Sequence, residues 1–290
     1  MAKNYLRAKI LEKNLKASKA KRNSLNRKDK EDNIIEWITF YRRNWNVYVE
    51  RILKIRLRPF QHFMLWLMSF SDIFFAMCCR GASKSFIVGL GAICQMNLYP
   101  YSNITITSST IPQANKMLDK KIRDELILKL SPYLQYMYEK GYIEYKTTDE
   151  GNKIVNNLTH SAIFVLPCLD SARGERSNML IYEEARLLKK SIIDSVFEKM
   201  SYPRQTIYGQ KEEYARNRRW QEQAKSIYIT SARFKSEWFW NTFKSCVNGY
   251  YMDTRIKYSI FAFDIFNAID NGLKTEVDYW KAINDSNDLD

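Results

Sequence analysis

A short polar turn between two apolar segments carries the residues of this chain best suited to chemistry. The apolar run 73–79 has the length of a buried strand, and it leads into Arg80-Gly81-Ala82-Ser83-Lys84-Ser85. An apolar segment of helical length, 84–98, follows directly. This is the layout of a loop whose backbone N–H groups and lysine surround a triphosphate. In such a loop Lys84 would reach the β- and γ-phosphates, and the Ser85 hydroxyl would bind Mg²⁺.

The loop departs from the usual phosphate-loop pattern, G-x-x-x-x-G-K-[ST]. The two glycines of that pattern would fall at Cys78 and Ser83, and neither position holds glycine. Gly81 alone remains to let the backbone close on the phosphates. Because a lysine–serine pair after a strand also arises by chance, a purely structural turn remains the alternative for this loop taken by itself.

Two adjacent carboxylates form the second motif. Glu183 and Glu184 follow the short apolar segment 179–182. In open α/β sheets, ligands bind at the carboxyl ends of the strands. One carboxylate there can hold Mg²⁺, and the next can orient the water that attacks a γ-phosphate. The alternative is an ordinary acidic helix cap, but a phosphate loop about 100 residues upstream favours the catalytic role.

A third element follows the acidic pair along the chain. The β-branched segment 226–229 ends in Thr230-Ser231-Ala232. Small hydroxylated side chains at the end of a strand are placed to lie beside a γ-phosphate and respond to its loss. By itself this stretch is only a strand followed by a turn, and its position after the acidic strand is what favours a functional role.

The remaining pattern predicts the elements that position these residues. Apolar segments of strand length alternate with segments of helical periodicity, which is typical of an α/β fold with a mainly parallel sheet and helices on both faces. The expected helices are one or two within 31–55, then 60–68, 84–98, 112–138 and 189–200. The expected strands are 73–79, 104–107, several short ones within 142–167, 179–182 and 226–230.

Composition and charge limit the class of partner. The 290 residues carry a net charge of +14, which favours a polyanion, nucleic acid before membrane. No apolar run approaches the ~20 residues needed to cross a bilayer, and the basic N-terminus has no apolar signal core. Residues 1–30 are rich in Lys and Arg and are expected to form a solvated arm or a contact to DNA or a partner. The five cysteines lack the spacing of a metal site and are expected to be buried thiols.

With these motifs in this order, the chain resembles the ATPase domain of the large terminase subunit, the viral motor that packages DNA into proheads. An arginine at the head of a deviant phosphate loop, as at Arg80, is characteristic of that family. The resemblance spans roughly residues 36–280 and implies a P-loop NTPase of the ASCE/RecA-like type. It rests on Phe40-Tyr41-Arg42-Arg43-Asn44, Leu57-Arg58-Pro59-Phe60-Gln61, the loop 80–85, Ser108–Ala114, Arg173-Gly174, Glu183-Glu184 and Thr230-Ser231-Ala232. The first acid is usually Asp in such motors, and here it is Glu183.

The resemblance implies two sets of site residues, one that binds ATP with Mg²⁺ and one that acts on it. The binding set is Gln61 on the adenine edge, Arg80, Gly81, Ala82, Ser83, Lys84 and Ser85 on the phosphates, and Ser85 with Glu183 on the metal. The acting set is Glu184 on the attacking water, Arg80 on the γ-phosphate within the same subunit, Thr230, Ser231 and Ala232 as the coupling motif, and Arg173 as an arginine finger. Arg173 would be offered to the nucleotide of the neighbouring subunit, and a loop salt bridge is the alternative for it.

These expectations divide the chain into a basic arm (1–30), a P-loop ATPase core (31–240) and a lid or C-terminal segment (241–290). Large terminases also carry a nuclease domain in which separated acids hold two metals. The acids from Asp264 onward lie too close to residue 290 to be housed in such a fold. The chain is therefore expected to be a fragment or truncated form that lacks the nuclease, and DNA cleavage is not expected from it.

The expected activity is ATP hydrolysis that powers translocation of double-stranded DNA into the prohead. The resemblance implies the portal protein and the small terminase subunit as partners, and a pentameric ring on the prohead, with a monomer possible in isolation. It also implies the host cytoplasm as the location, with transient docking on the prohead. Arg216, Arg218 and Arg219, interleaved with aromatic residues, are candidate DNA contacts, and a solvated helical face is the alternative.

Two other functions stay open. A helicase-type nucleic-acid-dependent ATPase would need a second motor domain, for which the chain after Ser231 leaves too little length. A non-hydrolysing basic scaffold that binds nucleic acid would leave the pairs Lys84-Ser85 and Glu183-Glu184 unexplained.

Overall fold

The computed structural model describes residues 27–148, 151–172, 176–204, 212, 222–231, 238–252 and 255–286. The chain divides into two compact units, Met1–Tyr41 and Arg42–Asp290. The described part of the first unit is helical and belongs to α2 (Arg27–Arg43). Most of the predicted basic arm lies outside the described residues. The second unit holds every strand of the described residues. It also holds the described residues of the predicted phosphate loop, acidic pair and coupling motif.

The second unit is built on an eight-stranded sheet with the order β3-β4-β5-β2-β6-β7-β1-β8. Strands β5, β2, β6, β7, β1 and β8 pair in parallel, and β4 pairs antiparallel with β3 and β5. The mainly parallel sheet predicted from the sequence is confirmed. The strands are β1 (Ile73–Cys78), β2 (Asn103–Ser108), β3 (Ile143–Thr148), β4 (Gly151–Asn156), β5 (Ser161–Pro167), β6 (Met179–Glu183), β7 (Lys225–Thr230) and β8 (Tyr258–Phe263).

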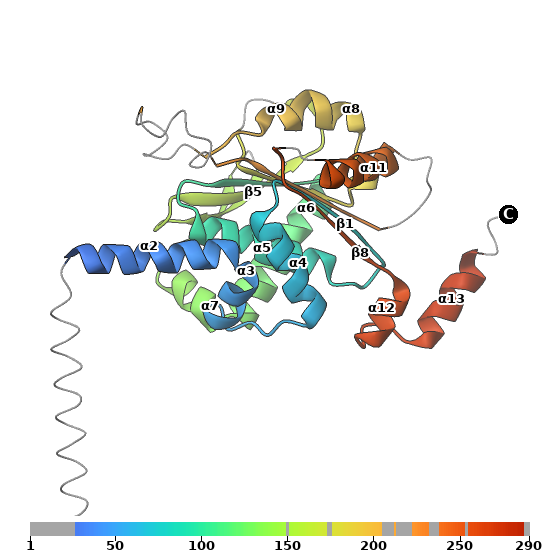
Figure 1. The fold of residues 1–290 in the computed structure, drawn as a ribbon, viewed down its shortest axis with the longest axis horizontal. Coiled ribbons are helices and arrows are strands. Elements are labelled where there is room, and N and C mark those ends of the chain that lie inside the picture. Colours follow the sequence, from blue (N-terminus) through green and yellow to red (C-terminus); the bar gives the residue numbers. More distant parts are fainter. Residues whose placement is uncertain are drawn as a thin grey trace, which may run out of the picture. The chain divides into compact units, whose positions relative to one another are not determined.

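Helices cover both faces of this sheet, as Figure 1 shows. The helices α4 and α5 lie against one face, and α8, α9 and α11 lie against the other. The helical elements of the second unit are α3 (Trp45–Arg51), α4 (Pro59–Phe70), α5 (Lys84–Leu98), α6 (Ile111–Lys116), the π-helix η1 (Met117–Leu130), α7 (Pro132–Glu139), η2 (Asp170–Ala172), η3 (Ala185–Leu187), α8 (Lys190–Ile192), η4 (Ile193–Phe197), α9 (Glu198–Met200), α11 (Trp238–Tyr251), α12 (Ile265–Asp270) and α13 (Glu276–Ser286).

The apolar sequence of α5 is explained by its burial beneath the sheet. Most of its side chains from Ile87 onward are buried, as expected for a helix that is apolar on nearly all sides. A Cβ at Gly91 would lie 2.5 Å from Cε of Met68, so glycine at this position leaves room for the end of that α4 side chain. This contact packs α4 against the helix that begins at the predicted phosphate loop.

Aromatic rings align the three strands that lead to the predicted motifs. Tyr182 on β6 and Tyr228 on β7 stand opposite each other in the strand register, and their rings stack with centroids 4.5 Å apart. Phe75 on β1 stands opposite Tyr228 on the other side, with centroids 6.1 Å apart. Such cross-strand pairs each stabilise a sheet by about 0.5–1.5 kcal/mol beyond area burial. The ladder therefore holds the carboxyl ends of β1, β7 and β6 in register.

The chain after residue 240 contributes more than the expected lid. Strand β8 pairs in parallel with β1 along its whole length, from Ile73 opposite Tyr258 to Cys78 opposite Phe263. No strand is predicted there from the sequence. The helical region expected over 112–138 is divided into α6, η1 and α7, and the last of these begins at Pro132 with the Ser131 hydroxyl accepting from the backbone N–H of Leu134.

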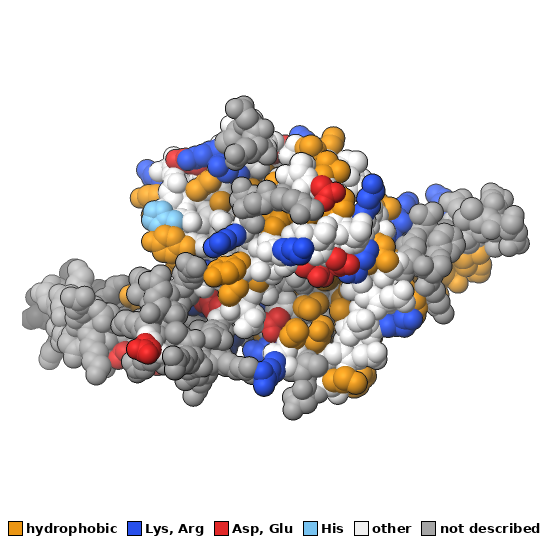
Figure 2. All heavy atoms as spheres, turned by 90° about the horizontal axis from the view of Figure 1, so that it is seen from above, with side chains coloured by type: hydrophobic (Ala, Val, Ile, Leu, Met, Phe, Trp, Pro, Cys, Tyr) orange, Lys and Arg blue, Asp and Glu red, His pale blue; other side chains and the backbone are white. Residues whose placement is uncertain are grey.

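Within the described part of the chain, no helix is long and apolar enough to cross a membrane. Figure 2 shows the face of the molecule that is uppermost in Figure 1. On this face, Lys and Arg side chains are interspersed with Asp and Glu. Lys190 and Asp194, one turn apart on α8 and η4, form an ion pair of this kind. The described atoms of this face thus carry mixed charge.

Candidate nucleotide-binding site

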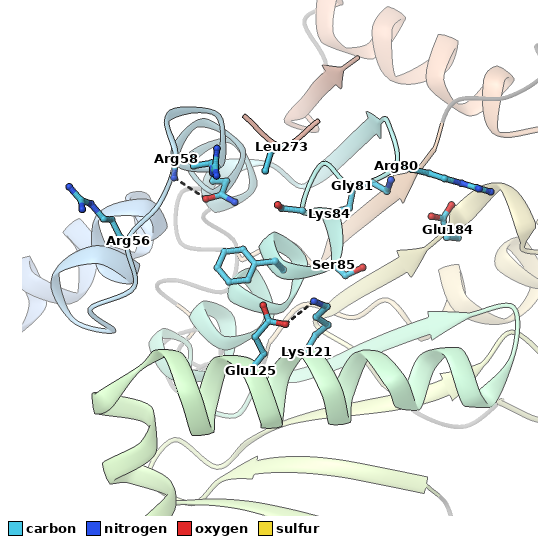
Figure 3. Close-up of a pocket in the computed structure, with 13 residues that line it drawn as sticks. Arg56, Arg58, Arg80, Gly81, Lys84, Ser85, Lys121, Glu125, Glu184 and Leu273 are labelled. Carbon is cyan, nitrogen blue, oxygen red and sulfur yellow. Dashed lines mark hydrogen bonds and ion pairs between the residues drawn. The ribbon is translucent and has the colours of Figure 1, made fainter. Parts of the chain in front are cut away.

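A cavity of about 790 Å³ opens beside the predicted phosphate loop (Figure 3). Its walls come from the start of α4 and the segment before it, the loop after β1, the first turn of α5, the helix η1, the end of β6 and the segment after α12. The lining residues are Arg56, Arg58, Gln61, Arg80, Gly81, Ser83, Lys84, Ser85, Phe86, Lys121, Glu125, Glu184 and Leu273. Most of the loop residues predicted to bind phosphate therefore border one hollow.

Two residues with positive φ turn the chain from β1 into α5. Gly81 has φ +84°, and Ser83, which precedes the helix, has φ +53°. Ser83 stands where the usual pattern has glycine, and it adopts the left-handed conformation that glycine takes most easily. The turn of the loop is thus formed by one glycine and by one serine in a strained conformation. Ala82 between them is 1% exposed and is not among the residues that line the cavity.

Lys84 is held at the centre of this turn. Its Nζ donates to the carbonyl oxygens of Cys78 at 3.2 Å and Cys79 at 3.0 Å, and to Oγ of Ser231 at 3.4 Å. A charged amine bound mainly to neutral carbonyls retains attraction for an anion. Arg80 is exposed on the same loop, and in Figure 3 its side chain extends on the side of the loop where Glu184 lies.

Ser85 and Glu183, both predicted to hold Mg²⁺, lie in contact with each other. The Ser85 hydroxyl donates to Oε1 of Glu183 at 2.6 Å. Burial raises the pKa of the Glu183 carboxyl, and the hydrogen bond from Ser85 opposes this. The described residues hold no cluster of three or more His, Cys, Asp or Glu that would bind a metal by themselves. A hydroxyl beside one carboxylate nevertheless fits Mg²⁺, which takes oxygen ligands and usually completes its shell with water and substrate phosphates.

Glu184 points to the cavity from the end of β6. Its backbone is left-handed, with φ +47°, so the chain turns sharply between the two carboxylates and separates them. The Ser231 hydroxyl lies 3.2 Å from Oε1 and 3.3 Å from Oε2 of Glu184, and the Ser231 backbone N–H donates to Oε2 at 3.4 Å. Ser231 thus contacts both Lys84 and Glu184. Thr230, its predicted partner in coupling, is fully buried and donates to the Ser231 carbonyl.

Gln61 lies at the other end of the cavity, in the first turn of α4. Its side chain is 6% exposed, and its Oε1 accepts from the backbone N–H of Arg58 at 2.9 Å. This is the reciprocal bond of a capping box, in which the side chain of the third helical residue returns to the residue before the helix. The start of the helix therefore fixes how Gln61 faces the cavity.

Lys121, Glu125 and Leu273 line the cavity but belong to none of the predicted motifs. The Arg58 side chain donates to the backbone oxygen of Asn271, which brings the segment after α12 over the cavity beside Leu273. On η1, Lys121 pairs with Glu125 one turn later at 2.7 Å, and both face the hollow (Figure 3). An i, i+4 ion pair is typical of a solvated helix face, so only the packing of η1 beside α5 places these two residues at the site.

Other predicted residues fall outside the described part of the chain. These are Arg173, the candidate arginine finger, Ala232 of the coupling motif, and Arg216, Arg218 and Arg219, the candidate DNA contacts. Their roles stay predictions.

Comparison with known proteins places the fold. No protein-family model and no curated protein sequence matches the chain. The HK97 bacteriophage large terminase superimposes with a TM-score of 0.51 at 14% identity, over 77% of this chain and 43% of that one. This chain shares its fold with part of a phage large terminase. A second solved structure, the Thermus phage P74-26 large terminase ATPase domain, gives 0.49 at 14% identity over 74% of this chain and 83% of that one.

A further large terminase, from a thermophilic bacteriophage and in complex with ATP-gamma-S, gives a TM-score of 0.44 at 11% identity, over 81% of this chain and 46% of that one. Of these three structures, the fold assignment rests on the HK97 large terminase. The chain spans less than half the length of that protein.

Proposed function

We propose that this chain is a Mg²⁺-dependent ATPase and serves as the motor domain of a phage terminase large subunit. The observation that carries the proposal is the pair of contacts made by Ser231, which joins the amine of Lys84 to the carboxylate of Glu184. A cation for phosphates and a carboxylate for water are thereby held at one cavity, in the arrangement that phosphoryl transfer requires.

Each side chain at the cavity has a separate task in this proposal. Lys84 and Arg80 bind the β- and γ-phosphates, and Gln61 at the opposite end binds the adenine edge. Ser85 and Glu183 hold Mg²⁺, which when bound neutralises charge on the phosphate oxygens. Glu184 accepts a hydrogen bond from the attacking water and takes its proton. Ser231, in contact with both Lys84 and Glu184, senses loss of the γ-phosphate and, with Thr230, passes that change into β7.

The strand order supports the ASCE class of P-loop NTPases, which is named for an additional strand and a catalytic glutamate. Strand β7 lies between β1, which leads to the loop, and β6, which ends in the two glutamates. Together with the fold shared with a large terminase, this supports translocation of double-stranded DNA into a prohead as the work driven by hydrolysis. The net charge of +14 suits a DNA partner.

The same proposal implies the assembly in which the motor works. The portal protein, the small terminase subunit and a homo-oligomeric ring of five subunits on the prohead are the proposed partners. The proposed location is the host cytoplasm with transient docking on the prohead. Arg173 is proposed to reach the nucleotide of a neighbouring subunit, so the isolated chain should turn ATP over slowly.

The test is ATP hydrolysis measured against protein concentration, for the wild type and for Lys84→Ala, Glu184→Gln and Arg173→Ala. We expect a rate that rises faster than linearly with wild-type concentration. Lys84→Ala should weaken ATP binding at least about tenfold, since a charge-assisted hydrogen bond contributes roughly 1.5–3 kcal/mol. Glu184→Gln should keep binding and lose roughly 10²- to 10⁴-fold in turnover. Lys129→Ala, an exposed lysine at the end of η1, is the matched control and should behave as wild type.

Mixing Arg173→Ala protein with Glu184→Gln protein tests action between subunits. Each variant retains the group that the other lacks, so mixed assemblies should recover part of the turnover. If the wild type hydrolyses no ATP but binds it in a manner lost in Lys84→Ala, the motor needs its partners. If the wild type does not bind ATP at all, the proposal is wrong and a basic scaffold takes its place. Strand separation by the isolated chain would instead support the helicase-type alternative.

A further inference from the structure

An arginine that no motif includes lies behind Glu184. Arg186 is in the short turn η3 that follows β6. Its side chain is only 10% exposed. Among the residues that the structure describes, its buried Nε and Nη1 atoms find no hydrogen-bond partner. A guanidinium group carries a positive charge, and a buried cation without compensation is strongly destabilising. The charge of Arg186 therefore needs a partner that is close by.

The partner is the carboxylate of Glu184. Nε of Arg186 lies 3.8 Å from Oε2 of Glu184, within the range of an ion pair and beyond that of a direct hydrogen bond. This is the ion pair that Arg186 forms within the described chain. The other side of the same carboxylate faces the hydroxyl and backbone N–H of Ser231. Glu184 is thus held between a buried cation and the end of β7.

The position of Arg186 suits an action on Glu184 and not an action on a bound ligand. Glu184 lines the cavity, whereas Arg186 is absent from its lining. A nucleotide in the cavity would meet the carboxylate first. The Glu184 backbone is left-handed, with φ +47°, where the chain turns into η3, and the Arg186 side chain reaches the same carboxylate. Because Arg186 does not line the cavity, its position argues against a role on phosphate.

We propose that Arg186 is a positioning residue that holds the Glu184 carboxylate in place for water activation. This inference rests on the proposed role of Glu184 in hydrolysis. When Glu184 swings away, the guanidinium loses its counter-charge in a buried environment, so that movement is opposed. The guanidinium and the carboxylate attract each other at 3.8 Å without a direct hydrogen bond. The carboxylate oxygens therefore stay free to accept from Ser231 and from water.

The experiment is a double-mutant cycle of Arg186→Met and Glu184→Gln, with two independent readouts. The first readout is the thermal midpoint of unfolding of the nucleotide-free protein. We expect Glu184→Gln to lower the midpoint, because the guanidinium is left buried without a counter-charge. Adding Arg186→Met should restore much of that loss, because the uncompensated charge is gone. Arg51→Met, at an exposed arginine of α3, is the control and should change neither background.

The second readout is ATP turnover at saturating ATP, together with the KM. Arg186→Met should lower kcat about tenfold or more and leave KM within about twofold, as expected when only the transition state is affected. Arg186→Lys, which keeps a cation, should recover part of the loss. In the Glu184→Gln background, Arg186→Met should cause no further loss in kcat, because its effect passes through Glu184.

The two readouts separate failure of this inference from failure of the proposed function. If Arg186→Met lowers the unfolding midpoint equally in both backgrounds, the pairing with Glu184 is not the role of Arg186 and the inference is overturned. The inference is also overturned if kcat falls equally in both backgrounds, or if KM rises while kcat is kept. If the wild type neither binds nor hydrolyses ATP but the midpoint is restored in the double mutant, the pair stands and the ATPase proposal is the part that fails.

Discussion

The Ser85 hydroxyl donates a 2.6 Å hydrogen bond to Oε1 of Glu183, and it joins the first turn of α5 to the end of β6. The two residues are far apart in the sequence and come from different motifs, yet they present adjacent oxygen atoms beside Lys84. We expect Ser85→Ala to weaken ATP binding about tenfold in the presence of Mg²⁺, which corresponds to the net contribution of one to two hydrogen bonds or metal contacts.

The same variant should bind ATP nearly as wild type does when Mg²⁺ is removed with a chelator, since its role is on the metal. Titration with a fluorescent ATP analogue in both conditions makes this comparison. Ser245→Ala, at an exposed serine of α11, is the control. Equal losses with and without Mg²⁺ would mean that Ser85 acts on the phosphates or on the loop conformation.

Replacing Ser83 with glycine should stabilise the protein. Ser83 has φ +53°, and it caps α5 without a side-chain hydrogen bond. The left-handed conformation costs a non-glycine residue about 1–2 kcal/mol, and the added freedom of glycine in the unfolded chain offsets about 0.5–1 kcal/mol. Ser83→Gly should therefore raise the free energy of unfolding by about 0.5–1 kcal/mol in a urea titration.

Gly81→Ala is the converse test, because it adds a side chain at the other loop residue with positive φ. Gly81 has φ +84°, and a Cβ there would lie 3.0 Å from Cε of Lys274, so the variant should lose about 1–2 kcal/mol. If Ser83→Gly destabilises the protein instead, the Ser83 side chain stabilises the loop by more than its left-handed backbone costs.

The Ser231 hydroxyl should matter for turnover more than for binding. It accepts from Nζ of Lys84 and donates to the carboxylate of Glu184. Ser231→Ala removes both contacts by deleting one oxygen atom. We therefore expect kcat to fall about two- to tenfold, the effect of a net 0.5–1.5 kcal/mol. The Kd for ATP should stay within about threefold. Ser226→Ala, near the opposite end of β7, should leave both values unchanged. A Kd that rises as much as kcat falls would place Ser231 in ground-state binding.

A buried lysine at the start of β7 should make stability depend on pH. Nζ of Lys225 donates to the backbone oxygens at the end of α4 and just after it, those of Met68, Ser69 and Ser71. These carbonyls lack partners within the helix. Removing the amine in Lys225→Met leaves them unpaired, and we expect a loss of about 1–3 kcal/mol at neutral pH.

The sign of the pH effect follows from burial, which lowers the pKa of Lys225 from 10.5 to about 8. Between these two pH values the unfolded chain binds the proton and the folded protein does not, so the stability contributed by this residue rises with pH across the window. The slope reaches at most about 1.4 kcal/mol per pH unit. Stability of the wild type minus that of Lys225→Met, measured by urea titration from about pH 7.5 to 10, should increase. A flat difference would mean that Lys225 keeps its charge in the fold.

The elements around the loop were predictable because their signals are local. The apolar run that ends before Arg80, the acidic pair at Glu183, and the β-branched segment that ends at Ser231 each identify a strand and its end without reference to the rest of the chain. Parallel strands then bring those ends to one edge, so the contacts of Ser85 with Glu183 and of Ser231 with Glu184 were within reach of sequence reasoning.

The parts that could not be predicted depend on partners far away in the sequence. Strand β8 is aromatic and short, and only its pairing with β1 across the fold distinguishes it from a segment of a lid. Arg186 and Leu273 belong to no motif. The position of Arg186 depends on the sharp turn at Glu184, and that of Leu273 depends on a segment that packs beside residues far away in the sequence. Local periodicity carries no information about either.

The contact between the Arg58 side chain and the Asn271 backbone has a consequence for synthesis of the chain. The part of the cavity lining at residues 56–61 is made early, and the part next to it is made only when Leu273 has been added. Strand β8, next to β1, is also a late addition. A nascent polypeptide therefore has its phosphate loop long before it has a closed pocket, and it gains the complete pocket only after about residue 273 has left the ribosome.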